Sequence, residues 1–346
     1  MRRKIINYSI NMGIILAVSI LTFIYLLKDN AHEVIGEILS LNAFSITIIF
    51  AVVAVSFLIE GLIIKIATVE YKKDFKIYDG VFVSSIGALF SAITPLKLGA
   101  LGGQIYGYVK KEVSTKDAFS STFKTSYAFQ MNLLLISIMV FIFTLTNDIN
   151  VDILNYSFNA RYIAVLGIVF NFVIFFLYLI VVFSKKLHNI FLKITSFFGF
   201  KFKRINCKEC YINESKDKLK TIQDNLIKFY KNTRESFSLI LLYVFKSFFM
   251  GGFPYLIYLL LTGDSFSVSI FFASVCLVQL HYFASAIVPI PGASGASELI
   301  FLALFAYIFP MYSLIASVLI LWRIFTYFFN IVFGLINFII IKCKKS

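Results

Sequence analysis

Long, uninterrupted runs of apolar side chains constrain this sequence more than any other feature. A helix needs about 20 apolar residues to cross a hydrocarbon core about 30 Å thick. Six runs meet that length: 5–27, 44–64, 118–146, 161–183, 237–262 and 313–341. The chain is 60% hydrophobic and only 14% charged, which leaves too little polar surface for a soluble domain. We therefore predict an all-α, polytopic integral membrane protein with six full spans, forming a single membrane domain over residues 1–346.

Two further apolar stretches, 81–110 and 268–309, are interrupted by helix-breaking residues. The breaks carry Pro95, Gly99, Gly102 and Gly103 in the first stretch, and Pro289, Pro291, Gly292 and Gly295 in the second. Irregular backbone at membrane depth persists only where protein or a water-filled cavity satisfies its N–H and C=O groups. We therefore predict two re-entrant hairpins that surround a polar cavity.

The distribution of positive charge predicts the orientation. The net charge is +14, and cytoplasmic loops of membrane proteins carry the excess of Lys and Arg. If both broken stretches return to the side from which they enter, almost all Lys and Arg gather on one side. The other side then receives only Lys28 and Arg161. We expect cytoplasmic N- and C-termini, a first hairpin entering from the cytoplasm and a second from outside, as in an inverted repeat.

The N-terminal run follows "MRRK" and has no small-residue cleavage site after it, so we expect a retained helix. Residues 184–236, with thirteen Lys or Arg against five Asp or Glu, form a basic cytoplasmic loop between the halves 1–183 and 237–346. This loop is either solvated or contains a helix on the anionic leaflet, because Leu219, Ile222, Leu226 and Phe229 recur at helical spacing. Cys207 and Cys210 lack two further ligands nearby, so we predict no metal site and no cofactor.

Ionisable residues inside the apolar segments are the candidate site residues, because an intramembrane charge costs at least a few kcal/mol. Arg323 lies about 15 Å from the outer end of its helix, too far to reach water by snorkelling. Lys246 is intermediate, whereas Glu60 and Lys124 either snorkel to the cytoplasmic interface or line the cavity. Lys97 lies inside the first break.

The second break is followed by Glu298 and a half-helix that Ser294 or Ser297 is expected to cap. The free N–H groups of such a half-helix attract a phosphate or carboxylate. Glu298 and Arg323 either pair with each other or bind a ligand together. We expect His281 to be a hydrogen-bonded core residue, and Gln104 and Gln279 to line the cavity or to bond across helices. A phospholipid head fits these groups better than an ion, since no ring of carboxylates is present.

The string "PIPGASGASE", with "TPLKLGALGGQ" and an Arg in the last span, resembles the lysylphosphatidylglycerol synthase transmembrane-region family, the flippase-like domain of multiple peptide resistance factors. The Pro-x-Pro-Gly-x-x-Gly-x-x-Glu pattern of the family falls here on Pro289, Pro291, Gly292, Gly295 and Glu298. Ala293 stands where the family usually has a second Gly. The resemblance implies a bacterial cell-membrane protein that moves lysyl-phosphatidylglycerol, or a related aminoacylated lipid, from the inner to the outer leaflet. That activity contributes to resistance to cationic antimicrobial peptides.

On this interpretation Lys97, Arg323 and the helix end near Ser294 hold the phosphate. Glu298, together with Glu60, meets the ammonium of the head group, and Ser297 and Lys246 line the same cavity. Full-length members of the family carry an aminoacyltransferase domain that uses lysyl-tRNA. This chain ends at "IKCKKS", so we expect it to lack that domain, with a separate aminoacyltransferase as a candidate partner. We expect no nucleic-acid binding unless the chain is itself a lysyltransferase. The alternatives are a phosphatidylglycerol lysyltransferase, a carrier of polyprenyl-linked sugars or other amphiphiles, and a structural subunit without a cavity.

Overall fold

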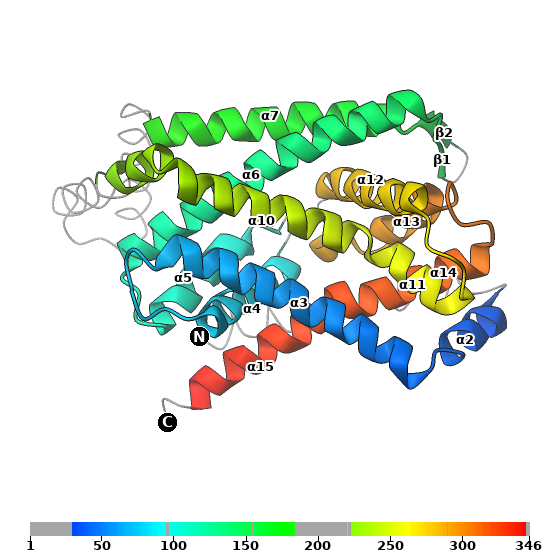
Figure 1. Cartoon of the computed structure of the whole chain (residues 1–346), viewed down its shortest axis with the longest axis horizontal. Helices are drawn as coiled ribbons and strands as arrows, with labels where there is room; N and C mark the ends of the chain where they lie inside the picture. The colour runs from blue at the N-terminus through cyan, green and yellow to red at the C-terminus, as the bar shows by residue number, and fades with distance from the viewer. Residues whose placement is uncertain are drawn as a thin grey trace.

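The computed structural model describes residues 30–94, 97–153, 156–183, 220, 223–288 and 290–343. Six helices of this part are long and apolar enough to cross a membrane. The predicted first span at 5–27, most of the basic loop with its C-x-x-C pair, and Pro95 and Pro289 lie outside the described residues. The elements in Figure 1 are α2 (Ala31–Leu39), α3 (Ala43–Thr68), α4 (Ile77–Ala92), α5 (Gly99–Lys110), α6 (Thr115–Thr146), β1 (Asn150–Ile153), β2 (Tyr156–Asn159), α7 (Arg161–Phe183), α10 (Thr233–Gly251), α11 (Phe253–Thr262), α12 (Val268–Ala286), η2 (Pro291–Ala293), α13 (Ala296–Phe305), α14 (Tyr312–Arg323), η3 (Ile324–Phe328) and α15 (Phe329–Cys343).

The architecture is that of an all-α polytopic membrane protein, as predicted. The predicted spans at 44–64, 118–146 and 161–183 correspond to α3, α6 and α7. The span at 237–262 corresponds to α10 and α11, and the span at 313–341 to α14, η3 and α15. The sequence interpretation missed the short helix α2 and the short antiparallel pair β1–β2, in which Asn150 lies opposite Asn159.

The first broken stretch is a hairpin of α4 and α5 that returns to the end from which it enters. An ion pair of 2.7 Å joins Asp79, in the first turn of α4, to Lys111, which follows α5. In Figure 1 both helices lie in the left half of the molecule. The turn between them, after Ala92, therefore lies near the middle of the bundle.

Close helix contacts hold α4 inside the protein although it is too short to cross a membrane. A Cβ added to Gly80 would lie 2.2 Å from the carbonyl oxygen of Gly61, so α3 and α4 touch backbone to backbone. Likewise, a Cβ on Gly334 of α15 would lie 2.5 Å from the carbonyl oxygen of Ser85. Small residues at these crossings let membrane helices approach closely, where van der Waals packing stabilises them.

The second broken stretch, α12, η2 and α13, enters from the opposite end. The amide of Ser267, just before α12, donates to the hydroxyl of Tyr255 at 2.8 Å. At the other end of the stretch, Phe309 stacks on Tyr258 with ring centroids 4.3 Å apart. Both ends therefore dock on α11, although α12 alone is long enough to span a membrane. Hairpins inserted from opposite ends are the arrangement that an inverted repeat predicts.

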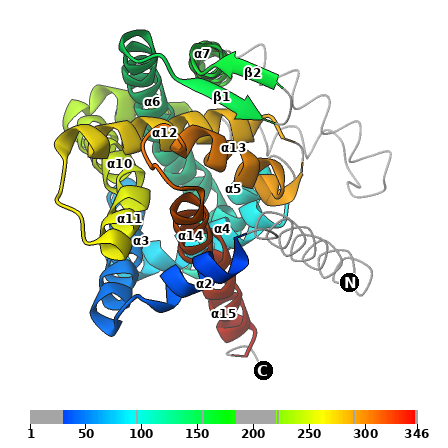
Figure 2. The ribbon, with the colours of Figure 1, turned by 90° about the vertical axis from the view of Figure 1, so that its right-hand side faces the viewer.

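The two ends of the bundle differ in charge. The end at which α3, α5 and α7 terminate carries most of the described Lys and Arg, including Lys65, Lys72, Lys110 and Lys116; we call it the basic end. The opposite end, which faces the viewer in Figure 2, is formed by α2, the β1–β2 pair and the helix ends around them. The largest apolar core cluster lies towards this opposite end and includes residues of α11, α12, α13 and α14.

Candidate functional site

The break in the second hairpin contains three residues with positive φ. Gly292, Ala293 and Gly295 have φ of 66°, 50° and 90°, a region that side chains disfavour. No side chain fits at Gly292 in any case, because its Cβ would lie 2.1 Å from the Tyr327 hydroxyl. The helix α13 begins immediately afterwards, with Gly295 at its N-cap. The expected caps, Ser294 and Ser297, therefore do not occupy that position; the backbone has already turned back before the helix starts.

Glu298 takes over the capping role. Its Oε2 atom accepts a hydrogen bond from the Gly295 amide at 2.7 Å. Its Oε1 atom accepts from Nε of Arg323 at 2.9 Å and from Nη2 at 2.5 Å. Glu298 is 0% exposed and Arg323 is 5% exposed. Of the two arrangements that the sequence leaves open, these residues adopt the mutual ion pair, and both carboxylate oxygens are in use.

Arg323 stands at a change in helix geometry. It is the last residue of α14 and is followed by η3, a π-helical turn over Ile324–Phe328. Such turns occur frequently at functional sites. Nη2 of Arg323 also donates to the carbonyl oxygen of Gly292 at 3.3 Å, and the guanidinium lies 4.6 Å from the ring centroid of Tyr327. One side chain thus binds both the broken backbone and the π turn.

The breaks of the two hairpins meet beside this ion pair. The hydroxyl of Tyr327 donates to the carbonyl oxygen of Ala92, at the end of α4, at 3.4 Å. From the first break, Nζ of Lys97 lies 5.6 Å from the ring centroid of Tyr282 on α12. We call the group of Lys97, Tyr282, Gly292, Glu298, Arg323 and Tyr327 the hairpin junction. The sequence interpretation missed both tyrosines, although the spacing of four residues between Arg323 and Tyr327 places them on one helix face.

Lys97 has no carboxylate partner among the described residues. It adopts a left-handed backbone with φ of 58°, and its side chain is exposed. Since Glu298 neutralises Arg323, the hairpin junction retains one uncompensated positive charge. A junction with that charge attracts an anion.

Two buried rings adjoin the junction. His281 is a hydrogen-bonded core residue, as predicted: its Nε2 lies 2.9 Å from Oγ and 3.1 Å from the carbonyl oxygen of Ser297. Because a carbonyl only accepts, Nε2 carries the proton and Nδ1 is an acceptor. Nδ1 of His281 and Nε1 of Trp322 have no hydrogen-bond partner among the described residues, and the two rings lie 5.1 Å apart. Unpaired buried polar atoms are costly, so both atoms have hydrogen-bonding capacity left for a polar group.

The other residues that the sequence predicted to line the cavity make contacts elsewhere in the protein. Glu60 of α3 pairs with Lys246 of α10 at 2.5 Å, and the hydroxyl of Tyr243 donates to Glu60 at 3.4 Å. Gln104 packs against Gly87, where a Cβ would lie 2.7 Å from its Cγ, so it serves the α4–α5 contact. Oε1 of Gln279 is buried and has no partner among the described residues. No described contact brings Glu60 or Lys246 to the hairpin junction.

Lys124 does not snorkel to the interface. Its side chain is 0% exposed and pairs with Glu70 at 2.7 Å and Glu235 at 3.0 Å. Its Nζ also lies 4.9 Å from the ring of Tyr71 and 5.5 Å from that of Phe229. Burial raises the pKa of the Tyr71 phenol, which therefore stays neutral beside the lysine. This cluster joins α6 to α10 at the basic end.

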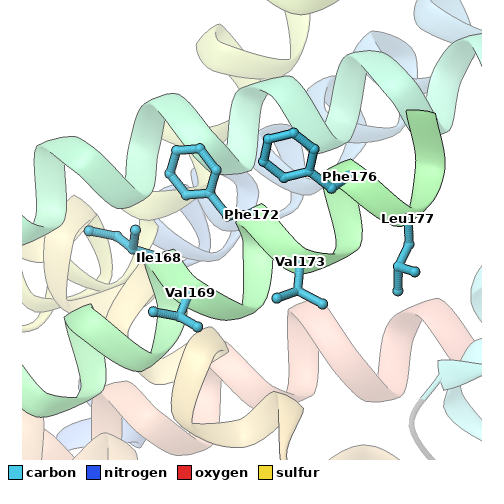
Figure 3. Close-up of a pocket in the computed structure, with 6 residues that line it drawn as sticks. All are labelled: Ile168, Val169, Phe172, Val173, Phe176 and Leu177. Atoms are coloured by element: carbon cyan, nitrogen blue, oxygen red, sulfur yellow. The ribbon is translucent and has the colours of Figure 1, made fainter. Parts of the chain in front are cut away.

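Two hollows in the described part lie away from the junction. The larger, of about 430 Å³, lies on the surface of α7 (Figure 3) and is lined by Ile168, Val169, Phe172, Val173, Phe176 and Leu177. A second, of about 340 Å³, is lined by residues of α6 with Phe272 of α12. Both linings are almost entirely apolar, as expected of surfaces that face acyl chains. A polar cavity at the hairpin junction stays a prediction.

The described residues contain no cluster of three or more His, Cys, Asp or Glu side chains that could hold a metal ion. Among known protein families, the one described as "Lysylphosphatidylglycerol synthase TM region" matches residues 11–334. The chain matches no curated protein.

Proposed function

Because the chain belongs to the lysylphosphatidylglycerol synthase transmembrane-region family, we propose that it translocates a phospholipid, with aminoacylated phosphatidylglycerol as the expected cargo, from the inner to the outer leaflet. The observation that carries this proposal is the hairpin junction. Two broken hairpins from opposite ends meet at a buried Arg–Glu pair and an unpaired lysine. Irregular backbone and charge at membrane depth are typical of the substrate sites of transporters.

The depth of the junction suits transport between leaflets. The short arms of the two hairpins, α5 and α13, contain 12 and 10 residues. At 1.5 Å per residue these arms are about 18 Å and 15 Å long, roughly half of a 30 Å hydrocarbon core. A head group bound at the junction is therefore about equally far from both faces. Small movements of the hairpins could open the junction to one face at a time.

Each residue of the junction has a role in this proposal. Lys97 and Arg323 bind the lipid phosphate, with help from the free N–H groups at the start of α13. Glu298 positions the guanidinium of Arg323, because both of its oxygens are already occupied. The acyl tails remain in the bilayer. Delivery of aminoacylated lipid to the outer leaflet would weaken the attraction of the surface for cationic peptides.

The membrane orientation belongs to the same proposal. The basic end faces the cytoplasm of a bacterial cell, by the positive-inside rule. The N- and C-termini are then cytoplasmic.

Reconstitution into vesicles tests the function. Fluorescent phospholipid analogues are placed in both leaflets, and a membrane-impermeant reductant quenches those in the outer leaflet. We expect the full chain to raise the quenched fraction beyond that of protein-free vesicles. The double variant Glu298→Gln with Arg323→Met, which removes both junction charges, should lose this activity. The matched variant Glu60→Gln with Lys246→Met, at the α3–α10 pair, should keep most of it.

Equal activity of both double variants would contradict a role of the junction in translocation. The enzyme alternative is tested separately, by incubating the purified chain with charged lysyl-tRNA and phosphatidylglycerol. Formation of lysyl-lipid in that reaction would assign the chain to the lysyltransferases.

A further inference from the structure

We propose that Glu37, which the hydroxyls of Ser313 and Ser317 hold against α14, binds the ε-ammonium of a lysyl head whose phosphate lies at the hairpin junction. The site lies outside the junction, at the end of the bundle opposite the basic end. The proposal rests on the proposed function for its cargo and for its role in transport. The binding itself is measured without transport.

The two carboxylates that the sequence places within the apolar segments, Glu60 and Glu298, are already engaged. Both oxygens of Glu298 are in use, because they accept from Arg323 and from the Gly295 amide. Glu60 pairs with Lys246 at 2.5 Å. An ammonium group at either carboxylate would displace a cation of the protein and leave it unpaired at membrane depth. The cationic part of an aminoacyl head therefore needs a different partner.

Glu37 is a carboxylate that is fixed in place but not neutralised. Its Oε1 atom accepts from the hydroxyl of Ser313 at 2.8 Å, and its Oε2 atom accepts from that of Ser317 at 2.6 Å. In the ranges that the structure describes, no ion pair joins Glu37 to a Lys or Arg. An ionised carboxylate offers about four acceptor positions on its two oxygens. Both oxygens can therefore still accept from an ammonium group.

Helix spacing accounts for this arrangement. Ser313 and Ser317 are four residues apart, so they lie on one face of α14, and both are buried. Val34 and Glu37 are three residues apart and share a face of α2. That face packs on α14, because Val34 is fully buried and its carbonyl oxygen lies 3.5 Å from the hydroxyl of Ser317. The carboxylate of Glu37 is therefore directed at α14, where it is partly buried.

The helix α14 sets the distance from the phosphate position to Glu37, because it carries both Arg323 and the two serines. Ser317 and Ser313 precede Arg323 by six and ten residues, about 9 Å and about 15 Å along the helix axis. At about 100° per residue, they also lie about 120° and about 80° around the helix from Arg323. On a helix about 10 Å in diameter, the straight separations are then roughly 12 Å and roughly 16 Å.

A lysyl arm has the length that this distance requires. An extended chain gains at most about 1.1–1.2 Å per bond. In lysyl-phosphatidylglycerol the ε-ammonium then lies up to about 14 Å from the phosphorus, whereas the α-ammonium lies about 9 Å away. With the phosphate at Arg323, the ε-ammonium therefore reaches the level of Ser317 and Glu37.

The charge of the surrounding end favours the same ligand. The end formed by α2, the β1–β2 pair and the adjacent helix ends (Figure 2) carries the carboxylates of Glu33, Glu37, Asp148, Asp152 and Asp264. Arg161 is its only Lys or Arg in the part of the chain that the structure describes. Surplus negative charge attracts cations over about one Debye length, about 8 Å at physiological ionic strength. A lysyl head that leaves the junction is therefore drawn towards Glu37 and away from the basic end.

Trp322 provides a binding assay, because it is the only tryptophan of the chain and precedes Arg323 in α14. The full chain in uncharged detergent is titrated with lysyl-phosphatidylglycerol while the Trp322 emission is followed. Two probes are compared with it: the same lipid acetylated at the ε-nitrogen, which keeps the arm but loses its terminal charge, and lysine methyl ester, which has neither phosphate nor tails. We expect lysyl-phosphatidylglycerol to bind about tenfold more tightly than the acetylated lipid, which corresponds to one charge-assisted hydrogen bond. Lysine methyl ester should bind more weakly than the lysyl lipid by at least about the same factor.

Substitutions on α2 test the cause. Glu37→Gln removes the charge but keeps an oxygen that can accept from a serine. It should abolish the preference for the lysyl lipid and leave binding of the acetylated lipid unchanged. Glu37→Asp, which keeps the charge on a shorter side chain, should retain part of the preference. The matched control is Glu33→Gln, which removes the same charge one turn earlier at an exposed position and should keep the full preference. Size-exclusion elution identical to that of the unaltered chain verifies that each variant is folded.

The outcomes separate this proposal from the proposed function. Equal binding of the two lipids by the unaltered chain, or a preference that survives in Glu37→Gln, would overturn the ammonium site. An equal loss of preference in Glu33→Gln would also overturn it, because the effect would then belong to the general charge of that end. Lysine methyl ester that binds as tightly as the lysyl lipid would overturn the distance argument from the phosphate.

The same lipids are then compared in the vesicle assay. If Glu37→Gln loses the binding preference but no lipid moves between leaflets even with the unaltered chain, the ammonium site is supported and translocation is refuted. If lipid moves but Glu37→Gln keeps the binding preference, translocation is supported and the ammonium site is refuted.

Discussion

The buried pair of Glu298 and Arg323 yields a stability prediction whose magnitude follows from its geometry. Glu298→Gln removes the negative charge but keeps an oxygen that can accept from the Gly295 amide, so the loss concerns the ion pair. It leaves Arg323, 5% exposed, without a counter-charge. Removing one partner of a buried pair costs about 3–5 kcal/mol. Replacing both partners by uncharged side chains is often nearly neutral, so adding Arg323→Met should restore most of the lost stability.

The assay is thermal unfolding of the detergent-solubilised protein. With about 2–4 °C for each kcal/mol, Glu298→Gln should lower the unfolding midpoint by roughly 6–20 °C. The double variant should recover most of that difference. Glu60→Gln is the matched single variant at the other membrane-depth pair, and we expect a smaller loss because Lys246 is 26% exposed and can reach a more polar environment. The reasoning would be refuted by a double variant less stable than Glu298→Gln, or by a single variant within about 1 kcal/mol of the unaltered chain.

Three further predictions concern the second break, the basic end and the orientation. Ala293→Gly should stabilise the protein by up to about 1 kcal/mol: it relieves a left-handed strain of about 1–2 kcal/mol at φ of 50°, less the roughly 0.4–1 kcal/mol that glycine costs through the unfolded chain. Gly292→Ala should destabilise it by at least about 1 kcal/mol. Thermal unfolding measures both, with Gly102→Ala, which has open space, as control, and a stabilising Gly292→Ala would contradict the observed backbone. Lys124→Met should lower the unfolding midpoint by several degrees because it leaves Glu70 and Glu235 without their cation. The control Lys116→Met, at an exposed position, should not lower it, and equal midpoints of the two variants would show that the Lys124 cluster contributes nothing to stability. The orientation is tested in a chain whose four native cysteines are replaced. Asp264→Cys should react with an impermeant maleimide on intact cells, whereas Lys73→Cys should react only after the cells are permeabilised; the reverse pattern would invert the proposed orientation.

Much of the fold could be predicted from the sequence because hydropathy and helix breakers act locally. The described spans follow from apolar length alone, and α3 at Ala43–Thr68 contains the predicted 44–64. Pro and Gly located both breaks, since these residues end helices whatever their surroundings. The β1–β2 pair was missed because each strand has only four residues, too few for a period of two to stand out.

The site was less predictable, because a helical pattern gives the depth of a residue but not the neighbour that it faces. The sequence placed Glu60 and Lys246 in spans, yet their pairing depends on how α3 packs against α10, across 186 residues of chain. The same limit left open whether Glu298 and Arg323 pair with each other. Tyr282 and Tyr327 were missed because their role depends on two breaks that meet only in three dimensions.

The contacts that join the two halves differ in strength, which bears on where movement occurs. Along α10 they are charged or paired: Lys124–Glu235, Lys246–Glu60 and a hydrogen bond of 2.9 Å between Asn132 and Ser247. Lys124 is fully buried, and loss of one partner of a buried pair costs about 3–5 kcal/mol, whereas Lys246 is 26% exposed and its pair with Glu60 contributes less. In the proposed translocation, we therefore expect the seam along α10 to stay closed.

At the junction the described contacts between the two hairpins are weaker. They include the cation–π contact of Lys97 with Tyr282. Tyr327, in the π turn beside the second hairpin, adds a 3.4 Å hydrogen bond to Ala92. A cation–π contact contributes about 0.5–2 kcal/mol. A charge-assisted hydrogen bond from Lys97 to a phosphate, together with the Coulomb attraction between the two charges, contributes more. An arriving phosphate can therefore draw Lys97 away from Tyr282 at little cost. Binding of the lipid head would then loosen the contact between the hairpins, which couples the presence of cargo to the opening of the junction.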